Sequence, residues 1–178
     1  TGNIVGFAME CYEKDIINYV DTGGLDLRFG NYEDMLELVQ EIGERKGLGG
    51  LLGEGVKRAA QRIGKGAEAL AVHVKGLEMT GYDLRGLKTA ALSFAVSFRD
   101  AYYDGQGAYL FDIKGISNRL STEKGKGKLV KDLEDLLAVL DSISICKVFV
   151  SAYEGFEDLA TLYSITTGIR ITPQELRM

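Results

Sequence analysis

The residues best suited to chemistry lie close together near the end of this sequence, where Asp141 precedes Cys146 by five positions. A thiolate is a nucleophile and a soft metal ligand, and a carboxylate accepts hydrogen bonds. Both residues also have ordinary structural interpretations. A buried cysteine packs as a small hydrophobic residue, and an aspartate before an apolar run often caps a helix. Taken alone, this spacing leaves the chemical and the structural interpretation open.

Three other stretches contain residues that can bind ligands. His73 is the sole histidine. A Ser-His-Asp set at any other place in the chain is therefore excluded, and so is a multi-histidine metal site within this chain. We expect His73 to face solvent or hold a hydrogen bond. The basic, glycine-rich run at 124–128 can hold an anion, although a solvated loop is the favoured interpretation. The glycines at 47–55 follow a helical pattern rather than a strand, which predicts a helix-to-helix turn rather than a phosphate-binding loop.

A group of ionisable and phenolic residues gathers where an apolar helix is expected to end. The group consists of Arg99, Asp100, Tyr102, Tyr103 and Asp104. Such residues can form the wall of a ligand pocket. An ordinary solvated helix end is the alternative.

Composition indicates a soluble globular protein of one or two domains, with 178 residues, 46% apolar and 26% charged. The net charge of -5 argues against non-specific nucleic-acid binding. No apolar run approaches the roughly 18–20 residues needed to span a membrane, and no secretory signal is evident. Two distant cysteines form no disulfide framework, so we expect a cytoplasmic protein.

Apolar residues recur at intervals of three and four along most of the chain, which predicts an all-α, multihelical fold with at most a short strand or two. A short strand is plausible within 69–79, and residues 25–29 form either an edge strand or an extended linker. The expected helices cover residues 3–20, 31–46, 51–63, 87–103, 128–140 and 156–167.

Local signals at two helix starts are strong. Asn31 is a good N-cap with Asp34 in the reciprocal position, and Gly47 is expected to close that helix. Thr172 and Glu175 form a capping box with Pro173 at the first helical position. Because only three residues follow this box, we expect the chain to be cut from a longer protein.

Several phrases together resemble one family, the tungsten-containing aldehyde:ferredoxin oxidoreductases. They occur in the order of the family, at similar intervals, and cover nearly the whole chain. The phrases are Ile4-Val-Gly-Phe-Ala-Met-Glu-Cys-Tyr-Glu-Lys14, Phe29-Gly-Asn31, Ala71-Val-His-Val-Lys-Gly-Leu-Glu-Met79 with Tyr82, Asp83 and Arg85, Ser97-Phe-Arg99, Asp141-Ser-Ile-Ser-Ile-Cys146 and Thr172-Pro-Gln-Glu175.

This resemblance implies a fold like the helical C-terminal domains of the family. A first helical domain would cover residues 1–104, and a second, truncated at its C-terminus, residues 105–178. The sheet-rich N-terminal domain, with most of the pterin platform and three cluster cysteines, would be missing. In family enzymes a tungsten bis-molybdopterin centre oxidises an aldehyde to a carboxylate, and electrons leave through a four-iron four-sulfur cluster to ferredoxin.

The resemblance also assigns roles to individual residues. Cys146 falls on the fourth cluster ligand, and Asp141 opens the pterin-contacting pattern Asp-x-x-Gly-Leu-Cys. Ser144 and Ile145 replace the glycine and leucine of this pattern. Tyr103 stands where many members have a histidine thought to transfer protons near tungsten. A phenol donates a hydrogen bond but is a poor base near neutral pH.

The implied partners are the missing N-terminal domain, ferredoxin and an aldehyde, and a homodimer is left open. We expect the chain alone to be inactive and free of cofactor, because one cysteine cannot hold a cluster that takes four thiolates. Two alternatives remain. Tyr102, Tyr103 and Ser144 allow a cofactor-free helical interaction module. A family member with another substrate, such as an aromatic carboxylate derivative reduced in the reverse direction, is the second. The choice between tungsten and molybdenum is undecided.

Overall fold

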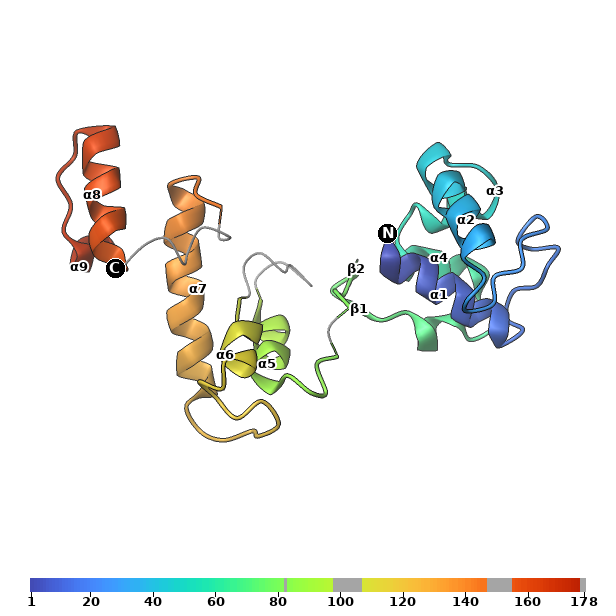
Figure 1. The fold of residues 1–178 in the computed structure, drawn as a ribbon, viewed down its shortest axis with the longest axis horizontal. Coiled ribbons are helices and arrows are strands. Elements are labelled where there is room, and N and C mark those ends of the chain that lie inside the picture. Colours follow the sequence, from blue (N-terminus) through green and yellow to red (C-terminus); the bar gives the residue numbers. More distant parts are fainter. Residues whose placement is uncertain (82, 98–106, 147–154, 177–178) are drawn as a thin grey trace. The chain divides into compact units, whose positions relative to one another are not determined.

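The structure, a computed structural model, describes residues 1–81, 83–97, 107–146 and 155–176. Across these ranges the protein is mostly helical and has one two-stranded sheet, which confirms the expected fold class (Figure 1). Two compact units divide the described residues, the first at 1–81 and the second at 83–97, 107–146 and 155–176. The expected domain boundary at residue 104 lies outside the described ranges and stays a prediction. No helix within these ranges is long and apolar enough to cross a membrane.

The first unit is built from four helices, a 3-10 turn and a hairpin. Its elements are α1 (Gly2–Glu13), α2 (Tyr32–Glu44), α3 (Gly47–Leu52), α4 (Val56–Ile63), η1 (Ala67–Leu70), β1 (His73–Val74) and β2 (Leu77–Glu78). The strands pair antiparallel, with His73 opposite Glu78, so the expected short strand is confirmed. Apolar side chains from the four helices and the loop after α1 form one core, in which Leu27 and Leu38 are fully buried.

Helix α1 ends seven residues earlier than the expected helix at 3–20. Asp15 adopts a left-handed backbone with φ of 54°, and the amide of Ile16 donates to the carbonyl of Cys11 at 2.9 Å. This reversal lets Ile17 enter the core, while Tyr19 is exposed. Burial of the loop therefore overrides the helical periodicity.

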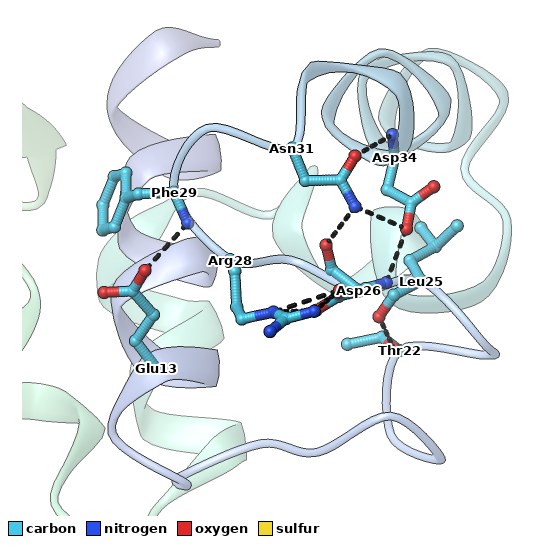
Figure 2. Close-up of polar contacts among 8 residues, drawn as sticks. All are labelled: Glu13, Thr22, Leu25, Asp26, Arg28, Phe29, Asn31 and Asp34. Atoms are coloured by element: carbon cyan, nitrogen blue, oxygen red, sulfur yellow. Dashed lines mark hydrogen bonds and ion pairs between the residues drawn. The ribbon is translucent and has the colours of Figure 1, made fainter.

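The segment before α2 is an extended linker rather than an edge strand. Asn31 caps α2 as expected, because its side chain accepts a hydrogen bond from the amide of Asp34 at 3.5 Å. The Asp34 carboxylate in turn accepts from the amide of Asp26 at 2.7 Å. The amide of Phe29 donates to Glu13 of α1 at 2.9 Å. Figure 2 shows how these contacts hold the linker against two helices.

The glycine-rich stretch at 47–55 connects helices, as expected, but it contains two breaks. Arg45, with φ of 57°, closes α2, and Gly47 begins α3 instead of ending the previous helix. Gly55, with φ of 92°, then separates α3 from α4, so the expected helix at 51–63 is divided in two. A side chain at Gly49 would place its Cβ 2.3 Å from the carbonyl carbon of Glu41. Close contact between α2 and α3 therefore requires glycine here.

The second unit is organised around one long helix. Its elements are α5 (Lys88–Val96), α6 (Tyr109–Ile113), α7 (Lys126–Ser142), α8 (Phe156–Thr167) and α9 (Pro173–Leu176). Helices α5 and α6 lie beside the first half of α7, and α8 lies beside its second half (Figure 1). The capping box before α9 is confirmed, since the amide of Glu175 donates to the Thr172 hydroxyl at 3.2 Å and the Glu175 carboxylate accepts from the amide of Thr172 at 2.8 Å.

A buried lysine anchors the start of α7. The Lys126 Nζ lies 3.6 Å from Oδ1 of Asp112, and these side chains are only 6% and 0% exposed. The same ammonium donates to Thr89 Oγ1 at 2.8 Å, to Ser117 Oγ at 2.7 Å and to the carbonyl of Asn118 at 2.9 Å. All three donors of the ammonium are thus used, as burial of a charge requires.

Asp112 also caps helix α5. Its Oδ2 accepts from the backbone amides of Thr89 at 2.9 Å and Ala90 at 3.1 Å, which are free donors in the first turn of α5. The expectation of a solvated loop at 124–128 is therefore wrong for Lys126. Gly125, with φ of 103°, directs the chain into α7 so that the next side chain is buried.

We expect Lys126→Met to lower the free energy of unfolding by about 3–5 kcal/mol, because it leaves the Asp112 carboxylate buried without its cation. Urea denaturation of the chain, followed by circular dichroism, measures this loss.

Lys128→Met is the matched control, since Lys128 pairs with Asp132 on the exposed face of the same helix. This change should cost less than about 1 kcal/mol. Equal losses for the two variants would contradict the anchoring role of Lys126.

Candidate functional site

Asp141 and Cys146 lie at the end of α7 opposite its buried anchor. Asp141 belongs to the last turn of the helix, and Cys146 follows four residues after Ser142. Both side chains are exposed. Leu137 and Leu140, on the other side of the helix, are buried against Leu159 of α8. The amphipathic pattern of α7 therefore directs the two candidate residues toward solvent.

The chain leaves α7 through a Schellman turn. The amide of Ile145 donates to the carbonyl of Leu140 at 2.8 Å, and the amide of Ser144 donates to the carbonyl of Asp141 at 3.1 Å. Ser144 is left-handed, with φ of 60°. Ile145 then packs against the cluster that contains Leu140, which is the apolar contact typical of this motif. These contacts place Cys146 directly after a turn of defined geometry.

The geometry of this turn can be compared with the pattern Asp-x-x-Gly-Leu-Cys that the resemblance implies, from which Ser144 and Ile145 depart. The position of Ser144 requires a left-handed residue, for which glycine is best suited, and the position of Ile145 requires an apolar contact. Isoleucine fulfils the second role. Serine adopts the left-handed conformation at a cost of about 1–2 kcal/mol. The turn after α7 is therefore formed with serine and isoleucine at these two positions.

The structure does not bring the other candidate residues to this turn. Tyr103, Arg99 and Asp100 lie outside the described ranges. His73 accepts a hydrogen bond at Nδ1 from the amide of Gly76 at 3.3 Å, as one of its expected roles requires. Among the described residues, no group of three or more histidine, cysteine or carboxylate side chains is arranged to hold a metal ion.

Cys11 is less suited to ligand binding than Cys146, which is exposed. It lies in α1 and is fully buried. Burial, and then the charge of Glu10, raises the pKa of the Cys11 thiol to about 11. The group is therefore a protonated thiol at neutral pH, so Cys146 is the better candidate for a thiolate ligand.

A cavity of about 250 Å³ lies beside the turn. Its lining joins the end of α7, with Ser142 and Ser144, to one side of α8, with Tyr163 and Thr166. Hydroxyl groups are therefore the main polar feature of the lining. This cavity was not predictable from the sequence, because the approach of α8 to α7 depends on their packing. The hydroxyl residues at 163–167 were the only local signal.

We expect one fast-reacting thiol in the native 178-residue chain. Cys146 is exposed, whereas Cys11 is buried and has a raised pKa. Titration with a disulfide reagent at neutral pH should consume one equivalent rapidly and the second only after unfolding. The fast phase should vanish in Cys146→Ala and persist in Cys11→Ala, and the opposite pattern would refute this assignment.

Relief of the left-handed strain at Ser144 should stabilise the second unit. We expect Ser144→Gly to raise the free energy of unfolding by about 0.5–1 kcal/mol in urea denaturation. Ser142→Gly, in the last turn of α7, should instead lower it by about 0.5 kcal/mol, because glycine is the poorer helix former. A destabilising Ser144→Gly would show that the serine side chain contributes more than its backbone strain costs.

Comparison with known proteins covers the whole chain. The family model described as aldehyde ferredoxin oxidoreductase, domains 2 and 3, matches residues 1–178. The chain is 33% identical, over 98% of its length, to the aliphatic sulfonate oxidoreductase, WOR-like subunit, of Pyrococcus furiosus. It is 30% identical, over 94% of its length, to the tungsten-containing aldehyde ferredoxin oxidoreductase of Pyrococcus horikoshii, and 29% identical, over 98%, to that of Pyrococcus furiosus.

The chain spans 26%, 28% and 29% of the lengths of these three relatives. It is therefore similar to about a quarter of each of them. Because the family match extends from the first residue to the last, the chain belongs to the aldehyde ferredoxin oxidoreductase family and corresponds to its domains 2 and 3.

Proposed function

We propose that this chain is the helical part of a tungsten-containing oxidoreductase that oxidises aldehydes to carboxylates and passes the electrons to ferredoxin. The observation that carries the proposal is the Schellman turn after α7, which presents Asp141 and Cys146 to solvent. The family match over residues 1–178 and the relatives named as tungsten-containing aldehyde ferredoxin oxidoreductases support it.

Cys146 has the properties of a ligand to an iron-sulfur cluster. Its thiol is exposed, and the turn before it is held by two backbone hydrogen bonds. Thiolates are the ligands that such clusters use, normally four in number. With Cys11 buried in the other unit, the chain offers one thiolate, and we propose that the others come from the missing N-terminal domain. The chain by itself should then be inactive.

Asp141 has the properties of a pterin contact. Its exposed carboxylate lies in the last turn of α7, near carbonyl groups that carry the negative end of the helix dipole. Both features favour a ligand that donates N–H groups, and a charged acceptor makes such hydrogen bonds stronger. When bound, the tungsten pterin supplies the two-electron oxidation and the cluster transfers the electrons onward. The part of Asp141 is to orient the pterin ring.

Tyr103 is the proposed residue near the substrate, flanked by Arg99 and Asp100. As a phenol it can donate a hydrogen bond to a substrate oxygen. Its high ordinary pKa makes it unsuited to accept a proton near neutral pH. We therefore propose a positioning contact in place of the proton transfer that the histidine of other members is thought to perform.

A second candidate function is the oxidation or reduction of another substrate class. The relative named aliphatic sulfonate oxidoreductase, WOR-like subunit, favours this candidate, since it is 33% identical to the chain. Rates with aldehydes and with aliphatic sulfonates, measured on the whole protein with a viologen acceptor, separate the two candidates.

We expect Cys146→Ala to alter or abolish the electron paramagnetic resonance signal of the reduced cluster in the whole protein, because it removes one of the four thiolates. Cys11→Ala is the matched control and should leave the signal unchanged. A wild-type signal in Cys146→Ala would end the ligand assignment. Absence of tungsten and iron from wild-type protein made in tungsten-sufficient anaerobic cells would instead favour the cofactor-free module.

A further inference from the structure

A second cleft lies in the first unit, where α4 meets the β1–β2 hairpin. It has a volume of about 570 Å³, within the range of roughly 300–1,000 Å³ that small-molecule sites occupy. Its polar lining comes from α4, from one residue that precedes this helix and from the turn of the hairpin. The residues are Glu54, Lys57, Arg58, Gln61 and Lys75.

The cleft is positively charged in a chain that is acidic overall. Three cations and one carboxylate line it, whereas the net charge of the whole chain is -5. The carboxylate of Glu54 lies 3.1 Å from Nη1 of Arg45 and 3.5 Å from Nη1 of Arg58. A further cation, Arg45, therefore offsets the one negative group of the lining. A concave surface with an excess of one sign of charge concentrates ligands of the opposite sign.

The turn of the hairpin places a lysine where another residue type would be easier to accommodate. Lys75 and Gly76 have φ of 52° and 103°, the positive values that a type I′ turn requires. The first position of this turn favours asparagine, aspartate or glycine, and other residues are strained there. Strain of this kind is tolerated more often at ligand sites than elsewhere. Lys65 has the same φ of 52° outside the cleft lining, so strain alone does not mark the site.

Two hydrogen bonds hold the turn beside α4. Oε1 of Glu78 accepts from the amide of Val56 at 2.5 Å, which attaches β2 to the first turn of α4. Nδ1 of His73 accepts from the amide of Gly76 at 3.3 Å across the turn. The backbone that carries Lys75 is thus fixed next to the helix that carries Lys57 and Arg58. Less conformational entropy is then lost when the three cations gather around one ligand.

We propose that this cleft binds a small molecule that carries a phosphate group. The planar guanidinium of Arg58 can donate two parallel hydrogen bonds to phosphate oxygens, and Lys57 and Lys75 add compact charges. The side-chain amide of Gln61 adds a neutral donor. A doubly charged group matches three cations and one carboxylate better than a single carboxylate does. This site is independent of Asp141 and Cys146 and of the proposed redox activity.

Calorimetric titration of inorganic pyrophosphate into the whole protein tests the proposal. Lys75→Asn removes one cation while placing a favoured residue in the type I′ turn, so the hairpin should be retained. We expect this variant to bind pyrophosphate about tenfold more weakly or worse, because it removes a hydrogen bond to a charged group. Unchanged affinity in Lys75→Asn, or no binding to wild type, overturns the proposal.

Lys65→Asn is the matched control, because it makes the same substitution at the same φ and removes the same charge outside the cleft lining. Its affinity for pyrophosphate should equal that of wild type. An equal loss of pyrophosphate affinity in both variants would indicate general charge attraction instead of a specific site, and would overturn the proposal. Citrate and a glutamate-rich peptide, titrated in parallel, should bind more weakly than pyrophosphate. Tighter binding of citrate would indicate a carboxylate ligand, and tighter binding of the peptide would indicate an acidic protein segment. Either result would contradict the proposal.

Discussion

The buried contact between Lys126 and Asp112 is the interaction on which the second unit depends. It joins three helices, because Lys126 begins α7, Asp112 belongs to α6 and the Asp112 carboxylate caps α5. Removing two charges from water is costly, and the hydrogen bonds to Lys126 and Asp112 offset this cost in the observed arrangement. The contact therefore selects one register for the start of α7. Since a helix rises 1.5 Å per residue, Asp141 lies about 22 Å from Lys126 along α7.

The C-terminal end of α7 is a single turn that has a structural role and also presents the two candidate residues. Leu140 and Ile145 point inward and close the Schellman motif, while Asp141 and Cys146, which alternate with them along the chain, are exposed. Ser144 provides the left-handed residue that makes this alternation possible. A turn held by its own backbone hydrogen bonds and apolar contacts keeps its geometry without help from a ligand. The candidate site is thus organised in advance on the part of the protein that this chain supplies.

The first unit depends on carboxylates that cap backbone amides from a distance. Glu13 accepts from the amide of Phe29, Asp34 from that of Asp26 and Glu78 from that of Val56. The chain has 23 glycines and one proline, so its loops have little intrinsic stiffness. Hydrogen bonds from side chains to the backbone provide this stiffness instead. The hairpin beside α4 benefits directly, because Glu78 fixes the strand that follows the Lys75 turn.

Features encoded within a few residues were predictable from the sequence alone. The helical class, the caps at Asn31 and Thr172 and the short strand near Val74 follow from periodicity and local hydrogen bonding. The pairing of Asp141 with Cys146 at a helix end and the family membership also followed from residue types in order. Tertiary structure decided the rest: the early end of α1, the break between α3 and α4, and the burial of Lys126. Each depends on partners far away in the chain, as Lys126 depends on Thr89 and Asp112. Because distant residues offset the cost of burying such a group, the local sequence contains no pattern that predicts its burial.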